Sequence, residues 1–130
     1  AREKPFLSSD TPTGRRVLLV EDEALIAMNV EDMLDALGYV VVAAAAEVDE
    51  ALAAVEGGGI DAALLDVNLR GRTSFPVADA LAARDVPFVF ATGYGTRGLR
   101  EDFRDRPVLQ KPFKLGDLER ALSGALAAAR

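Results

Sequence analysis

Cysteine and histidine are both absent from this 130-residue sequence, and each absence removes a class of chemistry. Without cysteine the chain has no disulfides, no thiolate zinc sites and no thiol nucleophile. Without histidine it lacks the most common general base and the usual side chain that carries a phosphoryl group on nitrogen. If phosphate passes through this protein, another protein must therefore supply the histidine.

Long apolar runs and excess positive charge are also missing. The longest apolar stretch, residues 39–46, is far shorter than the roughly 18 residues that mark a membrane span, and no charged and then apolar signal peptide opens the chain. The formal net charge is −6, whereas nucleic acids and anionic membranes attract clustered lysine and arginine. We therefore expect a cytoplasmic protein that binds no nucleic acid and inserts into no membrane.

The remaining composition is that of one globular domain. Half of the residues are hydrophobic and 28% are charged, and the length suits a single core between two helical layers. Residues 1–14 show no hydrophobic periodicity and contain two prolines, so we expect a flexible N-terminal leader there. The folded domain is expected over residues 15–130.

Five short apolar runs show no period-two alternation, which is typical of strands buried on both faces of a parallel sheet. They cover residues 17–20, 39–46, 60–65, 86–91 and 107–110. Segments with helical spacing of apolar residues follow these runs, at residues 25–37, 48–56, 77–84, 93–103 and 115–126. The alternation predicts an α/β fold, a doubly wound five-stranded parallel sheet with five flanking helices and right-handed crossovers.

Two segments are less regular. Residues 68–74 contain glycine and are predicted to form a loop. Gly93, Gly95 and Gly98 crowd the start of the fourth helix, and each glycine costs roughly 1 kcal/mol relative to alanine inside a helix. We therefore expect that helix to be loose.

Polar side chains follow four of the expected strands. Glu21 and Asp22 follow the first, Asp66 the third, Thr92 the fourth and Lys111 the fifth. Ligands of doubly wound sheets bind beyond the carboxyl ends of the strands, so these side chains should converge. Three adjacent carboxylates repel one another without a cation, and oxygen ligands favour Mg²⁺, with Mn²⁺ as a substitute. Alone, each acid is also explained as a helix N-terminal or solvated loop residue. Their joint order favours one site.

These residues resemble the receiver domains of bacterial response regulators, the phosphoacceptor half of two-component signalling. The resemblance covers residues 16–126 and rests on four motifs: Val20-Glu21-Asp22-Glu23, Leu64-Leu65-Asp66, Ala91-Thr92-Gly93 and Lys111-Pro112-Phe113. It implies a flavodoxin-like sheet of order 2-1-3-4-5. It also implies a role for each site residue, with Asp66 as the phosphoacceptor. Asp22 is then a direct Mg²⁺ ligand, Glu21 a water-mediated one and Asn68 a ligand through its backbone carbonyl. Thr92 would be the switch hydroxyl and Lys111 the cation that contacts the phosphoryl group, and the Lys111–Pro112 bond would be cis.

The sequence departs from the common receiver pattern in three places. Leu69 is followed by Arg70 where the family usually has proline, so a more mobile loop is expected. Val108 stands where a switch aromatic is usual. Residues 90–95 are similar to the signature of a subgroup that is often single-domain and paired with atypical kinases, and there Tyr94 is expected to take over the aromatic role. We expect phosphorylation of Asp66 to order residues 93–103 and change a partner-binding face.

The resemblance implies a stand-alone receiver, not an enzyme beyond its own phosphorylation and slow dephosphorylation. Its expected phosphodonor is a sensor histidine kinase or a histidine phosphotransfer protein. The expected output is a change in protein contacts without a DNA-binding domain, by a monomer or a weak phosphorylation-dependent dimer.

Three alternatives compete with this interpretation. Residues 93–98 match the glycine spacing of dinucleotide-binding loops, but Lys111 stands where that fingerprint expects an acid after the next strand. A Mg²⁺-dependent phosphatase with an aspartyl nucleophile usually has a second acid two residues later, where this chain has Asn68. A phosphate-independent pseudo-receiver would not need the acidic, hydroxyl and lysine positions that are all present.

Overall fold

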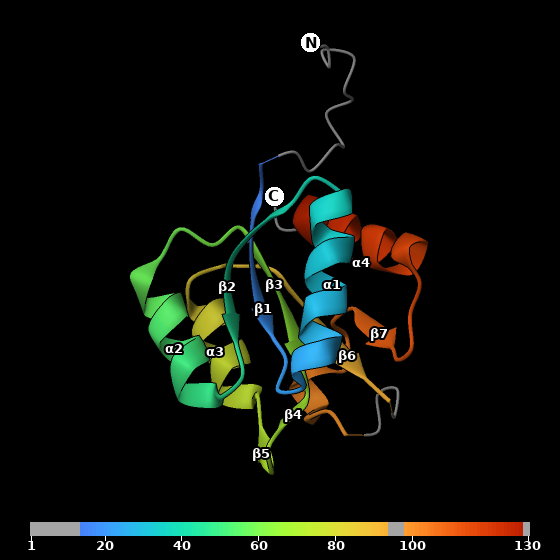
Figure 1. Cartoon of the computed structure of the whole chain (residues 1–130). Coiled ribbons are helices and arrows are strands. Elements are labelled where there is room, and N and C mark those ends of the chain that lie inside the picture. Colours follow the sequence, from blue (N-terminus) through green and yellow to red (C-terminus); the bar gives the residue numbers. More distant parts are fainter. Residues whose placement is uncertain (1–13, 94–97, 129–130) are drawn as a thin grey trace.

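The computed structural model describes residues 14–93 and 98–128, which fold around a parallel sheet (Figure 1). Its five strands lie in the order β2-β1-β3-β6-β7, and every neighbouring pair is parallel. The strands are β1 (Arg16–Val20), β2 (Val40–Ala45), β3 (Ala62–Asp66), β6 (Phe88–Thr92) and β7 (Val108–Gln110). The predicted doubly wound sheet and its 2-1-3-4-5 order are confirmed.

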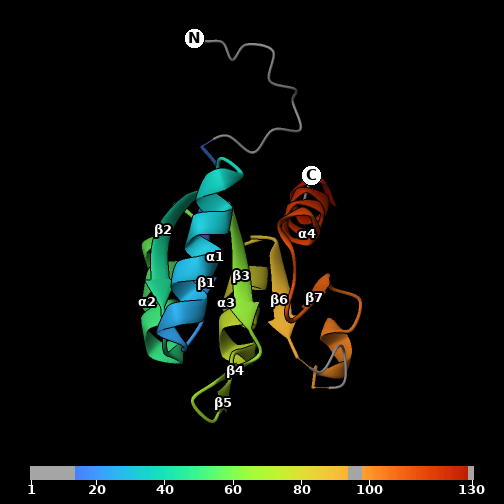
Figure 2. The same ribbon diagram turned by 45° about the vertical axis from the view of Figure 1, so that its right-hand side comes forward.

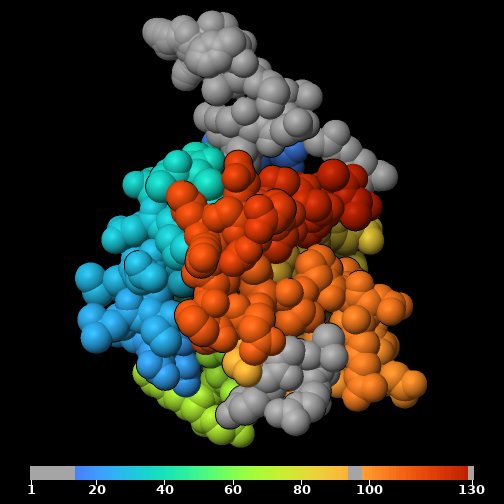
Figure 3. Space-filling view, turned by 90° about the vertical axis from the view of Figure 1, so that its right-hand side faces the viewer, coloured from blue at the N-terminus to red at the C-terminus, as the bar shows by residue number. Residues whose placement is uncertain are grey.

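Helices cover both faces of this sheet (Figures 1 and 2). They are α1 (Ala24–Ala36), α2 (Val48–Gly57), α3 (Phe75–Ala83) and α4 (Leu115–Ala128). Buried residues of α2 and α3 belong to one hydrophobic cluster, and those of α1 and α4 belong to another on the opposite face. In Figure 3 the face that carries α4 is in view, with α1 beside it. Within the described ranges, the helices are too short or too polar to cross a membrane.

The continuous apolar runs of the strands are explained by this two-sided burial. In β1, Leu18 and Val20 enter the cluster beneath α2 and α3, whereas Val17 and Leu19 enter the cluster beneath α1 and α4. Successive strand residues point to opposite faces, so a strand covered on both faces needs an apolar residue at every position. The sheet thus holds the ends of β1, β3, β6 and β7 in fixed positions.

The predicted number of helices was wrong for the part of the chain that the structure describes. It contains four α-helices, and the described part of residues 93–103, where the fourth of five helices was expected, has only a 3₁₀-helix, η2 (Glu101–Phe103). Leu99 and Phe103 are buried in the core, and the Arg100 guanidinium forms an ion pair with Asp79 of α3 at 2.7 Å. These contacts hold a short irregular segment against α3, and the nearby glycines disfavour a longer helix. Residues 94–97 lie outside the described residues.

The loop predicted at residues 68–74 is instead a small antiparallel hairpin. It consists of β4 (Asn68–Leu69) and β5 (Arg72–Thr73), and Leu69 pairs with Arg72 across a two-residue turn. Arg70 and Gly71 form that turn with φ values of 51° and 87°. Positive φ at both central residues gives the twist that short hairpins need. The hydrophobic periodicity of the sequence does not indicate these φ values, so the hairpin was not predicted.

Most other boundaries agree with the prediction to within about two residues. Gly38 ends the first helix with φ of 91°, as the sequence predicted. α3 begins at Phe75, with Pro76 in its first turn. Residues 1–13 of the predicted leader lie outside the described residues.

Candidate functional site

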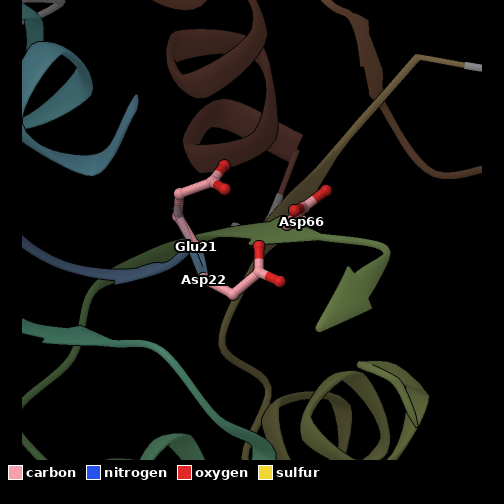
Figure 4. Close-up of side chains that lie close together, drawn as sticks. All are labelled: Glu21, Asp22 and Asp66. Atoms are coloured by element: carbon pink, nitrogen blue, oxygen red, sulfur yellow. The ribbon is translucent and has the colours of Figure 1, made fainter. Parts of the chain in front are cut away.

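Three acidic side chains meet at the carboxyl end of the sheet (Figure 4). Glu21 and Asp22 follow β1 directly, and Asp66 is the last residue of β3. One carboxylate oxygen from each residue lies within 4.8 Å of the other two. The acids converge because β1 and β3 are neighbours in register, with Val20 opposite Leu65.

Lys111, the residue after β7, brings a positive charge to this cluster from the other side of β6. Its Nζ atom donates a hydrogen bond to Oε1 of Glu21 at 2.9 Å and lies 3.3 Å from Oδ1 of Asp66. The Lys111 backbone N–H donates to the carbonyl oxygen of Thr92 at 2.8 Å, which joins the two strand ends. The peptide bond to Pro112 is cis, as the resemblance implied.

Burial makes the electrostatics of this cluster strong. The side chains of Glu21, Asp66 and Lys111 are only 5%, 14% and 22% exposed. Burial raises the pKa of Asp66 to about 6; the Glu21 charge adds to the rise and Lys111 opposes it. Burial would lower the pKa of Lys111, but its hydrogen bond to Glu21 and the charge of Asp66 outweigh that effect, and the pKa is raised.

The raised pKa of Asp66 predicts that its ionisation destabilises the fold. An unfolded aspartate loses its proton near pH 3.8 and the folded one near pH 6, so the free energy of unfolding falls as pH rises through this interval. We expect Asp66→Asn to be more stable than wild type at pH 8 by up to about 3 kcal/mol, and by less than about 1 kcal/mol at pH 4.

Urea unfolding in a chelator, at both pH values, measures this difference. Asp32→Asn, a change of an exposed acid on α1, serves as the matched control and should show no such dependence. A stability difference for Asp66→Asn that is the same at pH 4 and pH 8 contradicts the prediction.

The donor set fits a hard divalent cation. The described residues Glu21, Asp22 and Asp66 offer only carboxylate oxygens, and one lysine leaves a surplus of negative charge. Mg²⁺ prefers one or two carboxylates together with water or phosphate oxygens. Asp22 is partly exposed, so an ion has access from solvent.

Hydrogen bonds hold the two acids after β1 in place. Oε2 of Glu21 accepts from the backbone N–H of Glu23 at 3.1 Å. Oδ2 of Asp22 accepts from the backbone N–H of Arg70, at the tip of the β4–β5 hairpin, at 3.0 Å. The contribution of Arg70 was missed in the sequence, because the two residues are 48 positions apart and no local pattern joins them.

The other predicted site residues are distributed around this cluster. Thr92 is the buried last residue of β6. Asn68, two residues after Asp66, is exposed at the start of β4. Val108 is half-buried in β7 and packs against the core beneath α3. Tyr94 and Gly95 lie outside the described residues.

The two remaining glycines are exposed on either side of that gap. The Gly93 carbonyl accepts a hydrogen bond from Nε2 of Gln110 at 2.9 Å, and a side chain at Gly93 or Gly98 would meet no atom within 4 Å. A Cβ atom at either position would therefore meet no steric clash.

A separate hollow lies at the opposite end of the sheet, near the amino ends of its strands. It has a volume of about 510 Å³ and is lined by residues at the amino ends of β6 and β7 and at the ends of α3 and α4, among them Asp85, Pro87, Arg106 and Gly124. Glu21, Asp22 and Asp66 are not among the residues that line this hollow. The two features are therefore distinct.

Comparison with known proteins agrees with this geometry. The family described as "Response regulator receiver domain" matches residues 17–123. The chain is 35% identical over 126 residues to the transcriptional regulatory protein PdtaR of Mycobacterium tuberculosis, covering 94% of this chain and 62% of that protein. It is 34% identical over 125 residues to the phyllosphere-induced regulator PhyR of Methylorubrum extorquens, covering 92% and 46%. The chain thus spans about half to two thirds of these relatives.

Two solved structures have a higher sequence identity to this chain than these relatives do. The solution structure of SdrG from Sphingomonas melonis Fr1 is 56% identical, covers 88% of this chain and 97% of that one, and superposes with a TM-score of 0.79. The BeF3-activated conformation of SdrG is 57% identical with a TM-score of 0.75, covering 85% and 95%. In these structures the similarity extends over nearly the whole of the solved chain.

Proposed function

The chain belongs to the response regulator receiver domain family, and from this premise we propose that Asp66 accepts a phosphoryl group from a partner's phosphohistidine. The donor is a sensor histidine kinase or a histidine phosphotransfer protein, because this chain contains no histidine of its own. The reaction is Mg²⁺-dependent and takes place in the cytoplasm. The observation that carries the proposal is the Asp66 carboxylate, which lies among two other acids and 3.3 Å from a lysine ammonium.

The chemistry follows from the charges of the cluster. A carboxylate oxygen of Asp66 attacks phosphorus as the bond between phosphorus and the donor's imidazole nitrogen breaks, and the imidazole leaves with the bonding electrons. Lys111 neutralises negative charge on the phosphoryl oxygens. Asp22, Asp66, the Asn68 carbonyl and, through water, Glu21 would hold Mg²⁺, and the bound ion would supply further charge neutralisation between the anions. The Thr92 hydroxyl donates a hydrogen bond to a phosphoryl oxygen.

The signalling step is a change of protein contacts. SdrG, which is 57% identical, has a solved BeF3-activated conformation, and this supports an activated state of the same kind here. We infer that the response involves Thr92 and the glycine-rich residues 93–98. Tyr94 takes the role of the switch aromatic, because position 108 holds valine. The proposed product is a phosphoprotein that acts on another protein as a monomer or weak dimer, not a catalyst of multiple turnovers.

Intact mass after incubation with acetyl phosphate tests the acceptor chemistry. We expect the wild-type chain to gain one phosphoryl group in Mg²⁺ and none in excess chelator, because the clustered acids oppose an incoming anion without the cation. Binding of Mg²⁺ is measured separately by calorimetry. A chain that binds Mg²⁺ but gains no phosphoryl group from acetyl phosphate or from a phosphorylated histidine phosphotransfer protein contradicts the proposal.

A further inference from the structure

Arg70 has a backbone conformation that arginine rarely adopts. It occupies the first central position of the β4–β5 turn with φ of 51°, a place where asparagine or aspartate before glycine is usual. A left-handed conformation is unfavourable for a residue with a Cβ atom, because this atom comes too close to the following carbonyl oxygen. A strained residue beside a functional site is a reason to look for a role, and Arg70 lies beside one.

The turn brings Arg70 to the acid cluster. Its backbone N–H donates to Oδ2 of Asp22 at 3.0 Å, and a carboxylate oxygen of Asp22 lies within 4.8 Å of one from Asp66. Figure 4 shows the chain continuing from Asp66 into the hairpin beside Asp22. The Arg70 side chain therefore starts close enough to reach a group bonded to Asp66.

The Arg70 guanidinium forms an exposed ion pair with Glu47. Its Nη1 atom lies 3.0 Å from Oε2 of Glu47, the residue before α2, and the two side chains are 58% and 56% exposed. Ion pairs as exposed as this contribute little to stability and exchange with solvent. A second pair between the hairpin and α2, Arg72 with Asp49, is longer at 3.8 Å and more exposed.

We propose that Arg70 contacts the phosphoryl group on Asp66, and that Glu47 competes with this group for the guanidinium. The inference rests on the proposed function of Asp66. A phosphoryl group carries more negative charge and more acceptor oxygens than one carboxylate, and arginine binds such oxygens through two parallel N–H groups. On phosphorylation the guanidinium leaves Glu47, which also releases one of the contacts between the hairpin and α2.

Affinity for beryllofluoride, a phosphoryl mimic, tests the contact without turnover. In saturating Mg²⁺, calorimetry should show binding about tenfold weaker for Arg70→Ala, because a charge-assisted hydrogen bond is lost. Glu47→Gln should bind about threefold more tightly, because the competitor is removed. In the Arg70→Ala background, Glu47→Gln should have no effect, since Glu47 acts through Arg70.

Two further variants separate a contact from general electrostatics and from damage to the turn. Arg72→Ala makes the same change of charge on the same hairpin and should alter affinity by less than about twofold. Arg70→Gly keeps the N–H to Asp22 and suits positive φ, so it should lose affinity as Arg70→Ala does without losing stability.

The outcomes that overturn the inference differ from those that overturn the proposed function. Equal effects of Arg70→Ala and Arg72→Ala, or an unchanged effect of Glu47→Gln in the Arg70→Ala background, show that only the electrostatic field matters. Normal affinity for Arg70→Gly shows that only the turn matters. A wild-type chain that binds Mg²⁺ but neither binds beryllofluoride nor gains a phosphoryl group contradicts the proposed function itself.

Discussion

Asp66→Asn is expected to abolish phosphoryl incorporation from acetyl phosphate, whereas Asp32→Asn is expected to leave it unchanged. Asp66 is the acid of the described cluster that ends a buried strand and lies 3.3 Å from the Lys111 ammonium. The amide of asparagine is neutral and cannot attack phosphorus as a carboxylate does. Asp32 is an exposed acid on α1, so its variant controls for the loss of one charge.

Intact mass and peptide mapping together decide this prediction. The phosphorylated wild-type chain should carry its label on the peptide that contains Asp66, and the label should be labile to hydroxylamine, as an acyl phosphate is. Retention of one phosphoryl group by Asp66→Asn under the same conditions would place the acceptor elsewhere. Unfolding measurements on the variant exclude loss of the fold, since we expect this variant to be more stable at neutral pH.

Phe90→Ala is expected to lower the free energy of unfolding by about 4 kcal/mol. Phe90 is fully buried in β6, and its ring lies 5.4 Å from the rings of Phe88 and Phe103 and 6.1 Å from that of Phe75. Truncation leaves a cavity among rigid rings and removes their edge contacts. Such a loss is a large part of the total stability of an ordinary domain.

Urea denaturation measures this loss, with Leu25→Ala as the control. Leu25 is 80% exposed on α1, so its truncation should change stability by less than about 0.5 kcal/mol. A cost for Phe90→Ala below about 1 kcal/mol would mean that the aromatic cluster repacks to fill the space. Because Phe103 belongs to this cluster, the variant should also increase hydrogen exchange in residues 98–103.

Much of the fold was predictable because its signals are local. In β3, four successive buried residues from Ala62 to Leu65 indicate a strand covered on both faces, and Gly38 marks the end of α1. The position of Asp66 after such a strand is likewise visible in the sequence. Prediction was wrong at Phe103, where helical spacing of apolar residues indicated an α-helix, but the chain forms a 3₁₀ turn and the ring packs against Phe75 of α3.

The sequence by itself determined the order of the five strands of the main sheet and of the four α-helices, the residue types at the strand ends and the exclusion of cysteine and histidine chemistry. Only the tertiary structure decided that Lys111 bridges Glu21 and Asp66, that the hairpin amide of Arg70 supports Asp22, and that Glu47 holds the Arg70 guanidinium. The physical reason is the range of the interactions. Hydrophobic patterns and backbone preferences are visible among neighbouring residues in the sequence. The contact between Lys111 and Glu21 joins residues 90 positions apart.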